Sequence, residues 1–175
     1  MRELSKNDRW MGLIEEFENE DFSAWPEAAE AFHMRGVGYL HLKDAPKAER
    51  DLKEAVERDP EEGFFWYNLA ETCHALLKDD ARALDAYRKA FELEDNFGWM
   101  PAAAALKAVN ILLYQVRNDE ALDILRRYRD EDMEKLPPYW RFHILRAYAR
   151  TYAAQGREAE ARVKFRQALI VESTV

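Results

Sequence analysis

This chain of 175 residues contains little cysteine, glycine or proline and no long apolar run, and each of these features excludes a class of structure or setting. The single cysteine, Cys73, cannot form an internal disulfide, so a reducing and cytoplasmic setting is expected. Six glycines, six prolines and no segment with strand-like alternation favour an all-α fold. Since no apolar run reaches about 18 residues and no charged-then-apolar leader opens the chain, we expect neither a membrane span nor a signal peptide.

The charge balance and the missing motifs argue against several functions. Asp and Glu number 34 against 26 Lys and Arg, giving a net charge of −8, whereas a general nucleic-acid binder usually carries a basic footprint. Glycine-rich phosphate loops, HExxH spacing and a serine or cysteine nucleophile constellation are all absent. We therefore expect no nucleic-acid partner, no metal, no cofactor and no enzymatic activity.

The stretch from Phe32 to Pro60 has the pattern of two short helices joined by a turn. In the first, Phe32, Gly36 and Tyr39 share one face of a 3.6-residue helix. Asp44 stands where an N-cap is needed, just before the second helix. Pro60 follows that helix and disfavours helical geometry in the residue before it.

This two-helix unit recurs along the chain. The second helix of each copy begins with an alanine, and these alanines lie at positions 48, 83, 121 and 161, so that the intervals are 35, 38 and 40 residues. A large apolar residue follows each alanine four positions later. A repeat of this length, built from helix pairs, indicates a stacked helical array in which small residues let paired helices approach closely.

At these positions the chain resembles the tetratricopeptide repeat (TPR) family. The Phe32–Pro60 copy matches the family pattern except at Arg35, where the family prefers leucine. The resemblance implies an all-α, right-handed α-α superhelix of about four helix pairs plus an N-terminal helix. Residues 1–25 would form a capping helix and connector, and residues 26–175 the repeat domain. The approximate repeats are 27–60, 61–96, 101–135 and 138–173, and the second has one extra residue in its internal turn.

Helix boundaries follow from caps, prolines and periodicity. The expected helices span 7–19, 26–42, 45–58, 60–77, 80–94, 101–116, 119–131, 138–155 and 158–172. The 7–19 helix is interpreted as a cap over the first repeat, with an amphipathic arm that docks on a partner as the alternative.

The TPR resemblance implies that the first helix of each pair lines a concave groove. The residues expected to bind a partner there are Phe64, Tyr67, Asn68, Glu71, Leu106, Lys107, Asn110, Tyr114, His143, Arg146 and Arg150. His143, Arg146 and Arg150 share one helical face, and arginine pairs well with carboxylates. We therefore expect this half of the groove to hold an acidic peptide or a C-terminal carboxylate, an ordinary solvated charged face being the alternative.

The last predicted helix carries apolar residues that nothing in the sequence is expected to cover. Phe165, Leu169 and Ile170 are interpreted as a self-association surface, which would make a homodimer, unless arginine stems cover that edge. The function expected is a non-catalytic protein-interaction module or adaptor that binds a protein or peptide in the groove. A structural subunit that assembles through its C-terminal edge is the second hypothesis, and an enzyme or small-ligand sensor is the third.

Overall fold

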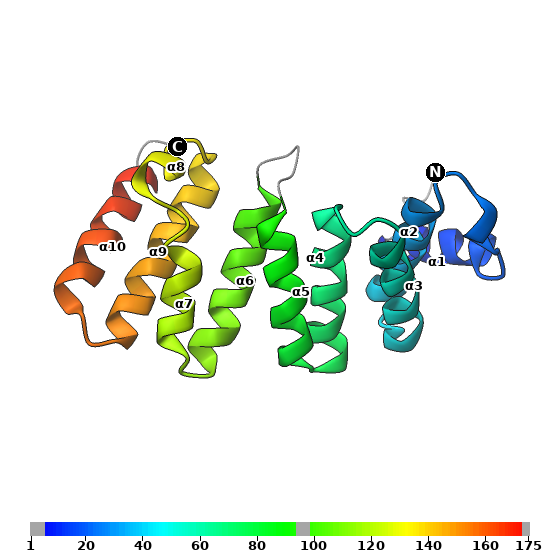
Figure 1. Ribbon diagram of the computed structural model, residues 1–175, viewed down its shortest axis with the longest axis horizontal. Coiled ribbons are helices and arrows are strands. Elements are labelled where there is room, and N and C mark those ends of the chain that lie inside the picture. Colours follow the sequence, from blue (N-terminus) through cyan, green and yellow to red (C-terminus); the bar gives the residue numbers. More distant parts are fainter. Residues whose placement is uncertain (1–5, 94–98, 173–175) are drawn as a thin grey trace. The chain divides into compact units, whose positions relative to one another are not determined.

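The computed structural model describes residues 6–93 and 99–172, and every regular element in those ranges is a helix (Figure 1). The prediction of an all-α fold built from consecutive helix pairs is therefore confirmed. The chain divides into two compact units, Met1–Leu93 and Glu94–Val175.

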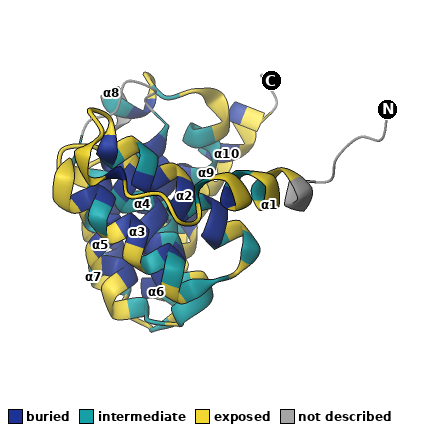
Figure 2. Cartoon of the chain, turned by 90° about the vertical axis from the view of Figure 1, so that its right-hand side faces the viewer, coloured by how far each residue is buried: buried dark blue, intermediate teal, exposed yellow. Residues whose placement is uncertain are grey.

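The first unit contains an N-terminal helix followed by two helix pairs. Its elements are α1 (Lys6–Phe17), the 3₁₀ turn η1 (Phe22–Ala24), α2 (Ala28–Leu42), α3 (Ala45–Arg58), α4 (Gly63–Glu71), the π-helix η2 (Thr72–Leu77) and α5 (Asp80–Glu92). Helix α2 packs on α3, and α4 with η2 packs on α5. Buried residues occupy much of α2 and α4, whereas α1 is mostly exposed or half-buried (Figure 2).

The second unit also contains two helix pairs. Its elements are α6 (Met100–Tyr114), α7 (Asn118–Leu125), the short α8 (Asp130–Met133), α9 (Pro138–Ala154) and α10 (Glu158–Glu172). Helix α6 packs on α7, α9 packs on α10, and α9 also contacts both helices of the preceding pair. Within the second unit, the α9/α10 pair thus rests on the α6/α7 pair, as stacked repeats require.

Side-chain caps fix several helix starts close to the predicted positions. The Asp44 carboxylate accepts a hydrogen bond from the Lys47 amide at 3.3 Å, and Asp79 accepts one from the Arg82 amide at 3.1 Å. The residues that end the preceding helices, Lys43 and Lys78, adopt left-handed conformations with φ of 63° and 57°. These two-residue corners, Lys43–Asp44 and Lys78–Asp79, position α3 against α2 and α5 against α4 and η2.

Two predicted boundaries were wrong. The second pair does not begin at Pro60 but at Gly63, because the Glu62 carboxylate caps the helix by accepting from the Phe64 amide at 3.0 Å. The helix expected over 119–131 ends at Leu125, where the Tyr128 amide turns back to the Leu125 carbonyl at 2.8 Å. Neither event leaves a mark as strong as a proline or glycine in the sequence.

Close approach of paired helices depends on small residues, as predicted. A Cβ atom added to Gly36 would lie 2.7 Å from Cγ of Leu52 on α3. Ala48, Ala83 and Ala121, which begin the second helices, are 0% exposed. The contact surfaces of the first three pairs therefore leave no room for larger side chains at these positions, whereas Ala161 of the fourth pair is half-buried.

Arg35, the departure from the TPR pattern, is buried and anchors the end of α1. Its guanidinium forms a forked ion pair with Asp51 of α3, at 2.6 Å and 3.2 Å, and Asp51 is 0% exposed. Its third nitrogen donates to the carbonyls of Phe17 and Glu20, at 2.9 Å and 2.8 Å. One side chain thus ties α2 to α3 and also satisfies carbonyls at the C-terminal end of α1.

The extra residue of the second repeat is absorbed inside a helix. Between Cys73 and Ala83 this repeat is one residue longer than the first, and residues Thr72–Leu77 form a π-helix there. A π turn holds one more residue than an α turn, so the chain still reaches the Lys78 corner. Cys73 is buried on this segment.

Candidate functional site

A stripe of polar and aromatic side chains runs along α9 in the second unit. Tyr139, His143, Arg146 and Arg150 follow one another at intervals of four, three and four residues, so they share a face of the helix. The rings of Tyr139 and His143 lie 4.4 Å apart between centroids, and the Arg146 guanidinium lies over the ring of Phe142 at 5.3 Å. The stripe offers both flat apolar surface and positive charge.

The α9 stripe is fixed to the neighbouring helix by one polar contact. Nη1 of Arg150 donates to Oδ1 of Asn110 on α6 at 2.8 Å. Within the described residues, no carboxylate forms an ion pair with Arg146 or Arg150, although both side chains are exposed. Their charges are therefore open to an anionic group from another molecule.

Arg146 and Arg150 also line a groove between α9 and α10. The groove encloses about 340 Å³. Its lining consists of Arg146, Ala149, Arg150, Ala153, Ala161, Arg162 and Phe165. Ala149, which is buried, and Ala161, which is half-buried, form its floor, and the exposed arginines form its rim. The groove can therefore accept an apolar side chain with acidic flanks.

The predicted residues of α6 differ in how accessible they are. Lys107, Asn110 and Tyr114 recur at three and four residues and share a face of α6. Asn110 and Tyr114 are exposed, the latter at 87%, whereas Lys107 and Leu106 are half-buried. The structure thus brings Asn110 to the α9 stripe through Arg150.

Burial and a neighbouring charge both act on His143. Burial lowers the pKa of its imidazole below the ordinary value, and the Arg146 guanidinium lowers it further. His143 is therefore neutral at physiological pH, so the charge of the stripe comes from its arginines.

The predicted residues of the first unit form a more closed surface. Phe64 and Tyr67 on α4 lie parallel, with ring centroids 6.4 Å apart, and Phe64 is 37% exposed. Asn68 is buried, and its amide nitrogen donates to Nε2 of His33 at 2.9 Å. Glu71 accepts a hydrogen bond from the hydroxyl of Tyr87. Phe64 and Tyr67 are thus the part of this set that can meet a partner.

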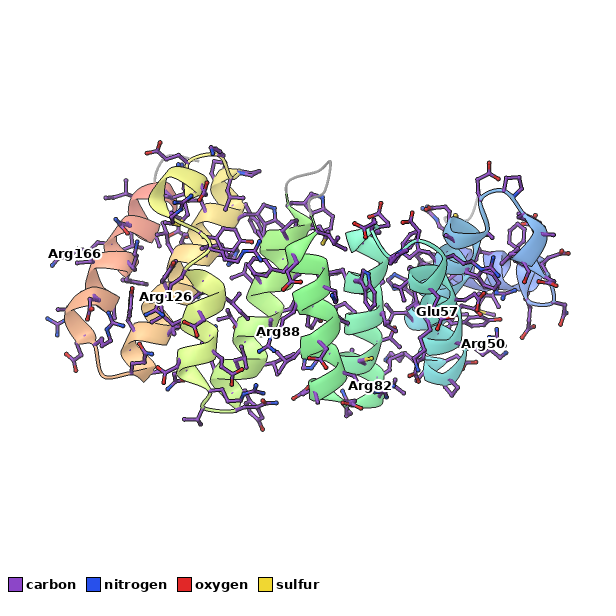
Figure 3. The ribbon with its side chains drawn as sticks, viewed as in Figure 1. Arg50, Glu57, Arg82, Arg88, Arg126 and Arg166 are labelled. Atoms are coloured by element: carbon purple, nitrogen blue, oxygen red, sulfur yellow. The ribbon has the colours of Figure 1, made fainter. Side chains whose placement is uncertain are left out.

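Helix α10 exposes large apolar side chains. Phe165, Leu169 and Ile170 are 49%, 45% and 64% exposed, and Val163 is 55% exposed. Arg166, labelled in Figure 3, extends from α10 away from α9. The helix therefore presents an outer face that combines apolar groups with arginine.

Sequence reasoning missed two features of these surfaces. It placed Arg162 only as a cover for the chain's edge, whereas Arg162 lines the α9/α10 groove with Phe165, three residues further along α10. It also missed the stack of Trp99 on Trp140, whose ring centroids lie 5.9 Å apart. The three-residue spacing of Arg162 and Phe165 was visible, but the meeting of Trp99 with Trp140 was not, because 41 positions separate them.

The described ranges contain neither a cluster of metal-binding side chains nor a membrane-spanning helix. Residues 6–93 and 99–172 contain no group of three or more His, Cys, Asp or Glu side chains placed to hold a metal ion. In the same ranges no helix is both long and apolar enough to cross a bilayer.

Comparison with known proteins relates the chain to solved structures by fold. One crystal structure of MamA matches with a TM-score of 0.68 and 17% sequence identity, over 99% of this chain and 98% of that one. A second crystal structure of MamA protein matches with a TM-score of 0.67 and 19% identity, over 95% and 92% of the two chains. No protein-family model and no curated protein sequence matches.

The fold and the structural matches together define a class of protein. Consecutive helix pairs packed through small residues, with full-length likeness to the two MamA structures, make this a TPR-like helical-repeat fold.

Proposed function

We propose that this chain is a TPR protein that acts as a non-catalytic interaction scaffold, and that its second unit binds an acidic segment of a partner along α9. The observation that supports the proposal is the pair Arg146 and Arg150, exposed and without a carboxylate partner among the described residues. Asn110 holds Arg150 toward α6, so the guanidinium is partly ordered before a ligand arrives.

The partner segment would combine carboxylates with apolar or aromatic side chains. Carboxylates would pair with the two guanidinium groups, which hydrogen-bond in a planar fork. Apolar groups would lie on Tyr139 and on the alanine floor of the α9/α10 groove. A free C-terminal carboxylate is one form that such a segment can take.

The test uses a fluorescein-labelled peptide of glutamates interrupted by leucine every fourth residue, prepared with a free and with an amidated C-terminus. The fluorescence anisotropy of the peptide should rise as this protein is added and binds it. The variant Arg146→Ala/Arg150→Ala should bind the peptide at least about tenfold more weakly, because hydrogen bonds to charged groups contribute about 1.5–3 kcal/mol each. The variant Arg126→Ala/Arg129→Ala removes two exposed arginines elsewhere in the second unit and is the matched control. Equal binding by both double variants would refute the acidic-segment proposal.

A second candidate function is structural assembly of copies of this chain. The exposure of Phe165 and Leu169 on α10 favours it, because apolar groups gathered on one helix face commonly mark a contact surface.

A further inference from the structure

The outer groove of α9 and α10 differs from its internal counterpart in a way that points to its partner. Helix α9 packs on α6 and α7, and there Leu122 and Leu125 are 3% and 0% exposed. In the repeat alignment, Arg146, Arg150 and Arg162 occupy the positions of Leu106, Asn110 and Leu122. The outer groove therefore keeps an apolar floor but carries three arginines on its rim, which suits an acidic partner better than another apolar helix.

A surface of opposite charge lies on the first unit. A hollow of about 130 Å³ opens between α1, η1 and α2. Its lining is Leu13, Phe17, Phe22, Trp25, Ala31 and Met34, with Arg35 below. Trp25 and Met34 are 43% and 49% exposed at its mouth. Apolar cavities of about 150 Å³ can hold a benzene-sized group.

Carboxylates surround this hollow. Glu30 lies one turn from Met34 on α2, and Glu16 lies one turn from Leu13 on α1. Exposed acids on the same elements and on the connector between them are Glu15, Glu16, Glu18, Glu20, Asp21, Glu27 and Glu30, of which Glu18 is paired with Lys47. Arg35 adds no free charge, because it is paired with Asp51. Arg9 lies one turn from Leu13 on α1, and Arg58, whose charge acts on Asp21, is paired with Glu54. These cations are fewer than the exposed acids, so the balance is acidic.

We propose that copies of this chain associate head to tail, with the α9/α10 face of one copy docked on the α1/α2 face of the next. Phe165, half-exposed on α10, enters the apolar hollow of the second copy. Arg162 and Arg166, three residues before and one after Phe165, then face the acids around that hollow. Arg162 is available for this, since its 3.3 Å contact with Glu158 is a surface ion pair of little strength.

This contact is heterologous, because two different surfaces of the chain meet. Such contacts extend into rings or filaments rather than stopping at a two-fold dimer. The inference rests on the proposed role as an interaction scaffold and names a second copy as a partner. It does not require an acidic peptide on the α9 stripe.

The test is light scattering on a size-exclusion column over micromolar to millimolar concentrations. The full chain should exceed its protomer mass of 20.6 kDa as concentration rises, and added salt should reduce the excess because exposed charges are screened. Phe165→Glu and Met34→Glu should each remain at the protomer mass. The matched controls are Val163→Glu and Met11→Glu, at 55% and 48% exposure, and they should associate like the unsubstituted chain.

Mixing Phe165→Glu with Met34→Glu, the two variants that should not associate by themselves, identifies the geometry of the contact. Phe165→Glu keeps an intact α1/α2 face and Met34→Glu keeps an intact α9/α10 face, so the mixture should form a one-to-one dimer of twice the protomer mass and nothing larger. Three results would each overturn the proposal: a protomer mass at every concentration, association that becomes stronger with added salt, and association of Met34→Glu by itself. The last result would indicate a tail-to-tail contact. Met34→Glu should still bind the acidic peptide probe, so failure of head-to-tail association and failure of the α9 site are distinguishable.

Discussion

The buried pair of Arg35 and Asp51 permits a quantitative prediction for the substitution Arg35→Leu. Leucine is the residue that the TPR pattern prefers there, so a comparison based on sequence would rate the change as stabilising. The structure predicts the opposite, because Asp51 is 0% exposed and would lose its forked partner. Removing one member of a buried ion pair costs about 3–5 kcal/mol. Arg50 still donates to Asp51 at 2.9 Å, which places the expected loss toward the lower end of that range.

The double variant Arg35→Leu/Asp51→Leu separates the ion pair from the anchoring of α1. Arg35→Leu/Asp51→Leu should be more stable than Arg35→Leu, since a well-packed apolar pair can replace a buried ion pair at little cost. It should not reach the unsubstituted chain, because the carbonyls of Phe17 and Glu20 lose their donor in both variants. Hydrogen exchange of the α1 amides should therefore accelerate in both, whereas α3 amides should recover in the double variant.

Urea denaturation followed by circular dichroism, with hydrogen exchange resolved by helix, gives these quantities. Glu18→Gln is the control, since Glu18 and Lys47 form an exposed ion pair at 2.7 Å that also joins the end of α1 to α3. Because this pair is exposed to solvent, its loss should lower stability far less than Arg35→Leu does. Equal stability of Arg35→Leu and the unsubstituted chain, or a double variant no better than Arg35→Leu, would refute this reasoning.

Three further predictions concern the two units separately. Burial lowers the pKa of His33 from 6.5 to about 4, so between these two pH values the unfolded chain binds a proton at His33 that the folded chain does not. The free energy of unfolding should therefore fall by about 3 kcal/mol as the pH drops from 6.5 to about 4. In urea titrations, His33→Gln should remove this pH dependence. Gly36→Ala should destabilise the first unit by about 1–2 kcal/mol, because the added methyl group overpacks against α3. Gly12→Ala, with no neighbour within 4 Å, should stabilise α1 by up to about 1 kcal/mol. If thermal melting ranks the two variants in the opposite order, the packing argument is contradicted. Tyr148→Phe, which removes a buried donor 2.5 Å from the Leu125 carbonyl, should lower the urea midpoint of the second unit by an amount equivalent to about 1–2 kcal/mol, and an unchanged midpoint would show that bond to be unimportant.

Local chemistry in the sequence predicted most of the helices and much of their packing. Asp44 and Asp79 are short-range caps, so they place helix starts without knowledge of the rest of the fold. Gly36 and the leading alanines report close helix contacts because a small side chain on a helix has few other uses. These signals act within one turn or one helix pair, which is why they are readable from sequence.

Hydrogen bonds and ion pairs between residues far apart in the sequence explain the positions of the polar side chains that could not be predicted. The position of Asn68 on its helix predicts a groove residue. Its amide is instead buried, because it donates a hydrogen bond to His33, 35 positions earlier in the sequence. Arg35 was recognised only as a departure from the TPR pattern, since its partner Asp51 and the α1 carbonyls lie on other helices. Both cases are decided by which side chains the packing brings together. The partner-binding roles of the α9 stripe and of Phe165 and Leu169 on α10 remain predictions.

The π turn at residues Thr72–Leu77 shows how this array tolerates changes of repeat length. The TPR period is 34 residues, whereas the leading alanines here lie 35, 38 and 40 residues apart. The one-residue excess is stored in the widened turn of η2, and the last excess falls in the region of α8. A sequence profile with a constant period loses its phase at each such site, even though the helices stay paired. Insertions that leave the helix pairs intact can thus obscure a repeat in the sequence, and the packing of the helices then shows the repeat more clearly than the sequence does.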